Sequence, residues 1–159
     1  MATTEEKGLE QKLVAKGLTA ARVTPDHIDS IIEEKHFFSA ADGLIGAVMG
    51  EFFKENPTGS VDDELVPHDQ AERLKRTTIC VLVLANGGIQ LGVNYCPVSA
   101  ENWNADVARE LAEKDARNKL WELEGYVLRQ RLFEQRQEEN EIASALADFQ
   151  ESDCEGCKI

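Results

Sequence analysis

The chain has 159 residues, enough for one domain, and its formal net charge of −13 disfavours binding to a nucleic-acid polymer, because most of this surface would repel a phosphate backbone. No segment approaches the roughly 18 to 20 apolar residues that span a bilayer, and the start has no secretory signal, so we expect neither a membrane protein nor an exported one. Four scattered cysteines fit a reducing compartment, and the sequence therefore predicts a cytoplasmic protein.

The N-terminal part predicts two helices. Residues 1–22 are polar with scattered apolar positions and indicate only a marginal amphipathic helix. A stronger start follows, since Thr24 can cap a helix, Pro25 suits its first position and Asp26 complements the positive end of the helix dipole. Isoleucines at helical spacing come next, and we expect this second helix to end near Lys35.

The following stretch gives weaker signals. Ser39 and Asp42 resemble a capping box, and apolar residues at helical spacing favour a helix over residues 39–54. Three glycines weaken that helix, so its assignment stays ambiguous. Residues 55–75 carry two prolines and many charges, which predicts an excursion or a long loop.

The strongest pattern is that of a β-hairpin. Residues 77–85 are nearly all apolar and rich in β-branched side chains, as in a strand covered on both faces. Residues 88–96 alternate more, which suits a half-exposed partner strand. Asn86-Gly87 between the two runs predicts a tight turn, because both central residues of such a turn need a positive φ.

A long helix is predicted after the hairpin. An irregular link over residues 97–102, in which Ser99 could cap a first turn, leads to a helical pattern over about 104–135. Gly125 within it indicates either a break between two helices or the close approach of another backbone. The sequence therefore predicts an α+β fold, in which a small antiparallel sheet built on a hairpin packs against a long C-terminal helix or helix pair. The expected core stripe of this helix is Val107, Leu111, Leu120, Leu123, Val127 and Leu132, with Ala108, Ala112 and Ala116 in close contacts.

No catalytic or metal-binding constellation is visible. Cys154 and Cys157 have the spacing of half a zinc site, but a structural zinc site needs four ligands and no second pair accompanies them, so we predict no metal. Cys80 has apolar neighbours and is expected in the core, whereas the place of Cys96 is left open. The three histidines share no useful spacing, and we predict neither an enzyme nor a cofactor.

The region around Trp103 favours a different chemistry, that of ligand binding. Trp103 is followed by Asn104 and Asp106 at the start of the long helix, and an indole face combined with guanidinium groups can recognise a nucleobase and phosphates. The alternative is that Trp103 is a partly buried core anchor and that the basic side chains pair with helix carboxylates. Basic residues recur along this helix at Arg109, Arg117, Lys119, Arg129 and Arg131.

Several ordered stretches carry a resemblance to a known family: Phe37–Gly43, Cys80–Gly87, Cys96, Ser99–Asn104, Ala116–Trp121, Leu123–Tyr126 and Leu128–Leu132. They resemble small phage proteins named after gene product 49 of one phage and gene 66 of another. This resemblance implies a variable N-terminal extension over residues 1–22, a family core domain over 23–135, and an acidic, partly helical tail over 136–159.

Part of that family is known as the type-one Thoeris anti-defence proteins, which bind cyclic ADP-ribose immune signals, and in some cases cyclic oligonucleotides, without cleaving them. The resemblance implies a homo-oligomer in the host cytoplasm with ligand pockets between subunits. Trp103, where the family typically has phenylalanine, would stack on adenine, and Asn104 stands where aspartate is usual. Arg109 and Arg129 would reach the phosphates or the base, with Lys119 and Arg131 as further candidates. The alternative function is a phage structural or interaction protein that binds a protein partner.

Overall fold

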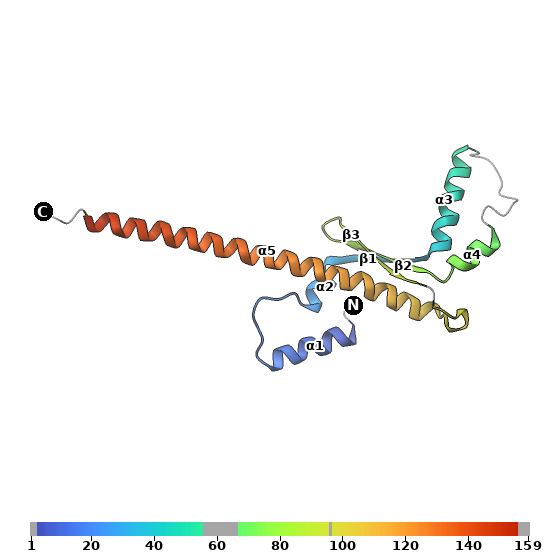
Figure 1. Ribbon diagram of the computed structural model, residues 1–159, viewed down its shortest axis with the longest axis horizontal. Helices are drawn as coiled ribbons and strands as arrows, with labels where there is room; N and C mark the ends of the chain where they lie inside the picture. The colour runs from blue at the N-terminus through green and yellow to red at the C-terminus, as the bar shows by residue number, and fades with distance from the viewer. Residues whose placement is uncertain (1–2, 56–66, 96, 156–159) are drawn as a thin grey trace.

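A computed structural model describes residues 3–55, 67–95 and 97–155, with side chains up to residue 147. The fold is α+β, as predicted, and a small antiparallel sheet packs against a long C-terminal helix (Figure 1). The strands are β1 (Ile32–Ser39), β2 (Thr78–Leu84) and β3 (Ile89–Asn94). The helices are α1 (Thr4–Ala15), α2 (Pro25–Ile31), α3 (Ala40–Glu55), α4 (His68–Leu74) and α5 (Ala105–Glu155), and a 3-10 turn, η1 (Ala100–Asn102), precedes α5.

The predicted hairpin is confirmed as the antiparallel pair β2 and β3. Its turn differs in detail from the expected one. Gly87 has a φ of 80°, but Asn86 does not adopt a positive φ; instead its side-chain Oδ1 accepts a hydrogen bond of 2.9 Å from the backbone N–H of Gly88. The side chain of Asn86 therefore replaces part of the backbone geometry that a two-residue turn would need.

β1 is a strand that the sequence pattern did not predict. The second helix was expected to continue to about Lys35, but α2 ends at Ile31 and β1 begins at once. β1 pairs antiparallel with β2 and places Phe37 opposite Cys80, so β2 is the central strand of the order β1-β2-β3. The physical reason is that a buried central strand must satisfy its backbone hydrogen-bonding groups on both edges.

The ambiguous stretch after β1 is helical, and its start is the expected capping box. The Asp42 backbone N–H donates to Ser39 Oγ at 3.1 Å, and the Ser39 N–H donates to Asp42 Oδ2 at 2.8 Å. These bonds to Ser39 hold the pKa of Asp42 below its ordinary value. The predicted excursion over residues 55–75 contains the short helix α4, and residues 56–66 lie outside the described part of the chain.

The core lies between the sheet and the first part of α5. Alternate residues of β2 and the three alanines expected at close contacts, Ala108, Ala112 and Ala116, are buried. Gly92 of β3 faces these alanines so closely that an added Cβ would lie 2.0 Å from the Ala112 carbonyl oxygen. Cys80 is fully buried, as predicted.

This close approach corrects the predicted core stripe of α5. Val107, Leu111 and Leu123 were expected in the core, yet each is about half exposed, at 52%, 48% and 47%. The helix turns its alanine face to the sheet, because only small side chains allow its backbone to lie against Gly92. Leu120 is the large residue of the stripe that is fully buried.

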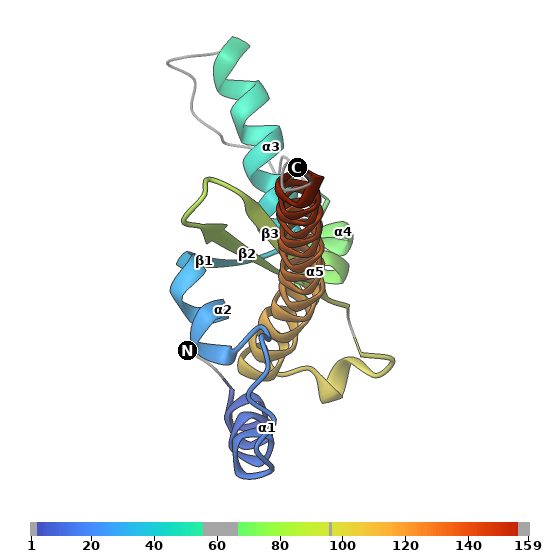
Figure 2. The ribbon, with the colours of Figure 1, turned by 90° about the vertical axis from the view of Figure 1, so that its left-hand side faces the viewer.

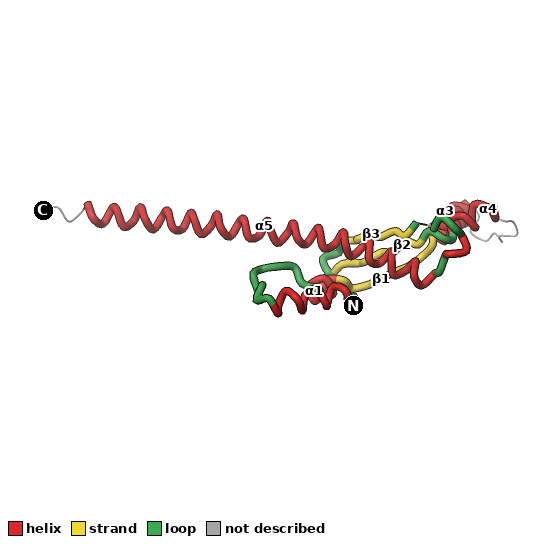
Figure 3. The backbone as a smooth tube through the Cα atoms, turned by 60° about the horizontal axis from the view of Figure 1, so that its bottom comes forward, coloured by secondary structure: helices red, strands yellow, loops and turns green. Residues whose placement is uncertain are grey.

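Gly125 marks neither a break nor a close contact, so both alternatives predicted for it are wrong. α5 runs through this position, and nothing lies within 4 Å of a Cβ added there. We call residues 105–124 the inner segment of α5 and residues 125–155 its outer segment. Seen almost along α5, the sheet lies to one side of the helix and α1 lies below (Figure 2). The outer segment extends away from the sheet (Figure 3).

Candidate functional site

A hollow of about 360 Å³ opens where the sheet, α3 and the start of α5 meet. Three aromatic side chains and two cationic ones contribute to its wall, together with one carboxylate. We call it the Trp103 pocket. Its lining is Phe37, Phe38, Ser39, Asp42, Lys75, Thr78, Trp103, Ala105 and Arg109.

Trp103 reaches this pocket because the chain is extended between η1 and α5. Its backbone has φ −77° and ψ 130°, and Asn104 then caps α5: Asn104 Oδ1 accepts from the N–H groups of Asp106 and Val107, both at 3.0 Å. The Asn104 side chain is therefore committed to the helix start. Ser99, which was expected to cap the preceding turn, makes no side-chain capping bond. Trp103 Nε1 is buried and has no hydrogen-bond partner among the described residues.

The cations of the pocket are held weakly. Arg109 Nη1 lies 3.4 Å from Asp106 Oδ1, and the arginine side chain is 57% exposed. Such an exposed pair contributes little, so the guanidinium can turn to another anion at small cost. Lys75 pairs with Glu72 one turn earlier in the chain and is also exposed. The Asp42 carboxylate is occupied by its two bonds with Ser39, which leaves Arg109 and Lys75 as the available charges.

Three of the predicted site residues lie elsewhere. Lys119 Nζ donates to the Leu91 carbonyl at 3.1 Å and pairs with Asp115 at 2.6 Å, beside β3. Arg129 and Arg131 lie on the outer segment and are exposed. At 1.5 Å per residue, Arg129 is about 30 Å along the helix from Arg109. The structure thus brings together Trp103, Asn104, Asp106 and Arg109, and separates Lys119, Arg129 and Arg131 from them.

Part of the pocket wall and the role of one arginine are not evident from the sequence pattern. Phe37, Phe38 and Lys75 line the pocket but were not candidates, because neither β1 nor the helix α4 that ends just before Lys75 was predicted. Arg117 was grouped with the basic residues of the helix, yet it is only 1% exposed. No local sequence pattern could identify Arg117 as a buried, paired residue, since its partners Glu6 and Asp29 are 111 and 88 residues away in the chain.

Arg117 joins α1 and α2 to α5 in what we call the Arg117 cluster. Its guanidinium donates to Glu6 at 3.2 and 3.0 Å and to Asp29 at 2.9 Å. Trp121 Nε1 donates to Glu6 at 2.8 Å. Burial raises the pKa of Glu6, but the bonds from Trp121, the Thr3 N–H and Arg117 outweigh it, and the pKa lies below its ordinary value. Since these charges already satisfy one another, the cluster reads as a structural anchor rather than as a ligand site.

The described part of the chain shows neither a metal-binding cluster nor a membrane-spanning helix. The described side chains, in residues 3–55, 67–95 and 97–147, include no group of three or more histidine, cysteine or acidic residues that could bind a metal ion. Cys96, Cys157 and the side chain of Cys154 lie outside the described residues, so the predictions made for them stay predictions. No helix in the described ranges is both long enough and apolar enough to cross a bilayer.

Residues 23–132 match the model of a protein family described as "Phage protein (N4 Gp49/phage Sf6 gene 66) family". The match begins just before α2 and ends within α5, so it includes the whole sheet and the Trp103 pocket. α1 and most of the outer segment of α5 lie beyond it. No curated protein and no solved structure matches the chain.

Proposed function

The chain belongs to the phage protein family of N4 Gp49 and phage Sf6 gene 66, and from this premise we propose that it binds a small cyclic nucleotide signal and holds it without cleaving it. The signal would be a cyclic ADP-ribose isomer or a cyclic oligonucleotide made by host defence, and the protein would act in the host cytoplasm. The observation that carries the proposal is the meeting of Trp103 and Arg109 with Phe37, Phe38 and Lys75 around one hollow.

The chemistry of the pocket supports this class of ligand. Its volume of about 360 Å³ is within the usual range for small-molecule sites, which is about 300 to 1,000 Å³. Stacking of a base on an aromatic ring contributes about 1 to 3 kcal/mol, and a charge-assisted hydrogen bond about 1.5 to 3 kcal/mol. Both kinds of group are present in the pocket, although the protein has a net charge of −13. Because Arg109 pairs with Asp106 and Lys75 with Glu72, a bound phosphate would take the place of these exposed carboxylates.

Each residue has a distinct part in the proposal. Trp103 supplies the stacking face, and Arg109 leaves Asp106 to bind a phosphate, with Lys75 as the second cation. Asn104 holds Trp103 in place by capping α5, which makes it a positioning residue. Arg129 and Arg131 could reach a Trp103 pocket only on another copy of the chain, so a pocket shared between subunits stays a prediction.

Calorimetry with cyclic ADP-ribose isomers and cyclic di- and trinucleotides tests the proposal. We expect tight binding to one of them, and heat denaturation should release that nucleotide with unchanged mass. Trp103→Ala should weaken binding about 10- to 100-fold, the loss of one stacking contact. The control is Tyr126→Ala, which removes an aromatic ring that is 66% exposed on the outer segment and should leave affinity unchanged.

Three results would contradict the proposal. A folded Trp103→Ala protein that binds as tightly as the wild type would remove Trp103 from the site. Release of an altered nucleotide would mean that the protein is an enzyme. Failure to bind any of these nucleotides would favour the second candidate, an interaction protein of the phage.

One observation supports that second candidate. The outer segment of α5 exposes large apolar side chains, Tyr126 at 66% and Phe133 at 51%, along a helix that extends from the folded body. Exposed apolar surface of this kind is typical of a protein-binding surface. The interaction hypothesis predicts that a defined phage or host protein co-purifies with the chain and that Phe133→Ala abolishes this association.

A further inference from the structure

α1 lies against α5 without packing tightly on it. None of the twelve residues of α1 is buried. A hollow of about 250 Å³ opens beside the helix, lined by Leu9 and Leu13 of α1 and by Val23, Pro25 and Trp121 of the segments next to it. Leu9 is 60% exposed. Because these apolar side chains do not close on one another, the burial of apolar surface contributes little to the docking of α1.

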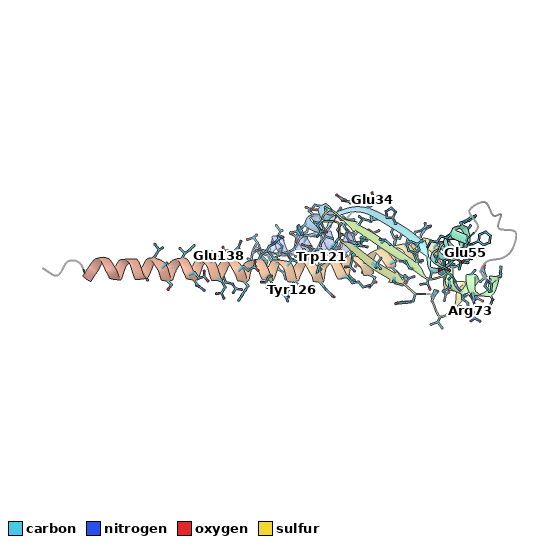
Figure 4. All side chains as sticks on the ribbon, turned by 90° about the horizontal axis from the view of Figure 1, so that it is seen from above. Glu34, Glu55, Arg73, Trp121, Tyr126 and Glu138 are labelled. Carbon is cyan, nitrogen blue, oxygen red and sulfur yellow. The ribbon has the colours of Figure 1, made fainter. Side chains whose placement is uncertain are left out.

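Two glutamates join α1 to α5 in the described part of the chain. Glu5 pairs with Lys114 at 2.9 Å, but these side chains are 80% and 53% exposed, so the pair contributes little. Glu6 is only 17% exposed and accepts from Arg117 at 3.0 and 3.2 Å and from the indole N–H of Trp121 at 2.8 Å. Figure 4 labels Trp121 at this place on α5. The bonds to Glu6 are charge-assisted and sheltered, which makes Glu6 the main point of attachment of α1.

The linker between α1 and α2 allows α1 to move by itself. α1 ends at Ala15, and Gly17 then adopts the left-handed conformation with a φ of 72°. Residues 16–21 are exposed. Arg22, at the end of the linker, bonds back to Glu10 of α1 at 2.5 Å and not to the sheet or α5. α1 can therefore leave α5 while α2 stays in place.

The core of the protein is built without α1. The buried cluster comes from α2, the sheet and the inner segment of α5, and no residue of α1 belongs to it. α1 also precedes residues 23–132, the part of the chain that matches the phage protein family, whereas Arg117 and Trp121 lie inside that part. Elements outside the core open at a lower free energy than the core itself, so α1 can open separately.

We propose that α1 is a detachable strap, which Glu6 fastens to Arg117 and Trp121 and which opens while the sheet and α5 stay packed. A helix of twelve residues is marginal in water by itself, so α1 unfolds when it detaches. Opening uncovers the guanidinium of Arg117, which is 1% exposed in the closed state, and the indole of Trp121. The strap thus controls access to a cationic and aromatic surface on an acidic protein. This inference goes beyond the proposed function, since the Arg117 cluster shares no residue with the Trp103 pocket.

Hydrogen exchange of the full chain, resolved to peptides by mass spectrometry, tests whether α1 opens separately. The amides of α1 should be at least about 100-fold less protected than those of β2. Their exchange should be insensitive to low concentrations of urea, because opening of the strap exposes little surface, whereas exchange of β2 should accelerate with urea. If α1 and β2 showed equal protection and the same dependence on urea, α1 would open only with the core, and the proposal would be wrong.

Trp121→Phe tests the attachment without changing the sequence of α1. The variant keeps an aromatic ring but loses the N–H that donates to Glu6, so the protection of α1 should fall about 10-fold. Lys114→Ala is the matched control, because it removes only the exposed pair with Glu5, and it should change the protection of α1 by less than about 3-fold.

Glu6→Ala removes the attachment from the side of the strap. It should lower the protection of α1 by about 10- to 100-fold, and β2 should stay at least about 100-fold better protected than α1. The control is Glu5→Ala, with a change of less than about 3-fold. Unchanged protection of α1 in both Glu6→Ala and Trp121→Phe would overturn the proposal, and so would a Glu6→Ala protein in which β2 loses its protection together with α1.

Discussion

The inner and outer segments of α5 belong to one continuous helix, but different interactions hold them. The inner segment is fixed by small residues: three buried alanines let its backbone lie against Gly92 of β3. It is also fixed by the Arg117 cluster, whose carboxylates come from α1 and α2. The outer segment has neither kind of contact with the described remainder of the chain. The comparison teaches that the continuity of a helix does not imply that all of it is stabilised by the same contacts.

The largest expected effect comes from replacing glycine by alanine at two positions. Gly92 of β3 contacts the inner segment, and Gly125 lies in the outer segment. Gly92→Ala should lower the free energy of unfolding by about 3 kcal/mol, because the new Cβ would lie 2.0 Å from the Ala112 carbonyl oxygen and 2.4 Å from the Ala116 nitrogen. Gly125→Ala should raise it by about 1 kcal/mol, since the added methyl group meets nothing within 4 Å and alanine favours a helix. Urea unfolding followed by circular dichroism measures the free energy of unfolding of both variants. Equal changes in the two variants would contradict the difference between the inner and outer segments.

A second comparison concerns two arginines of the inner segment. Arg117→Ala should lower the free energy of unfolding by about 3 kcal/mol, because it leaves Glu6 and Asp29 without the buried cation that binds them. Arg109→Ala should change it by less than about 0.5 kcal/mol, since that side chain is 57% exposed. The same urea experiment distinguishes them. If Arg117→Ala were as harmless as Arg109→Ala, the cluster would not be an anchor.

The smallest expected effect is a dependence on pH that comes from Glu6. Its pKa in the folded protein lies below the ordinary 4.5, so its contribution to stability is fully present above that value. The contribution is lost as the pH falls through the lower, folded-state pKa. Glu6→Gln should therefore flatten the loss of stability measured between about pH 5 and pH 2. Glu5→Gln is the control, because the Glu5 side chain is 80% exposed, and an equal flattening would contradict the assignment to Glu6.

The features that sequence patterns predicted correctly are those set by local chemistry. The hairpin followed from two β-rich runs around Asn86-Gly87, and the start of α3 followed from Ser39 and Asp42. β1 was missed because Ile28, Ile31 and Ile32 continue a helical spacing into the strand. Its strand character depends on β2, which lies about 45 residues later in the chain, and such pairing leaves no local trace.

The candidate site shows the same division: residues close together in the sequence were predicted correctly, and residues distant in the sequence were not. Trp103, Asp106 and Arg109 are near one another in sequence and do share the pocket region, since one link and one helix start position them. Arg129 and Arg131 were grouped with them by residue type, and helix length separates them by about 30 Å. Phe37, Phe38 and Lys75 come from segments whose place only the tertiary structure defines. Short-range geometry was accessible from sequence, and long-range proximity was not.

Because Cys80 is buried, the chemical labelling of its thiol can measure how often the core between the sheet and α5 opens. The thiol is 0% exposed and burial raises its pKa to about 11, so at neutral pH an alkylating reagent can neither reach it nor find it as a thiolate. Labelling of the peptide that contains Cys80 must then wait for the sheet to separate from the inner segment of α5. The labelling rate, followed by mass spectrometry, would report how often the closed core exchanges with an open state, and at what free-energy difference.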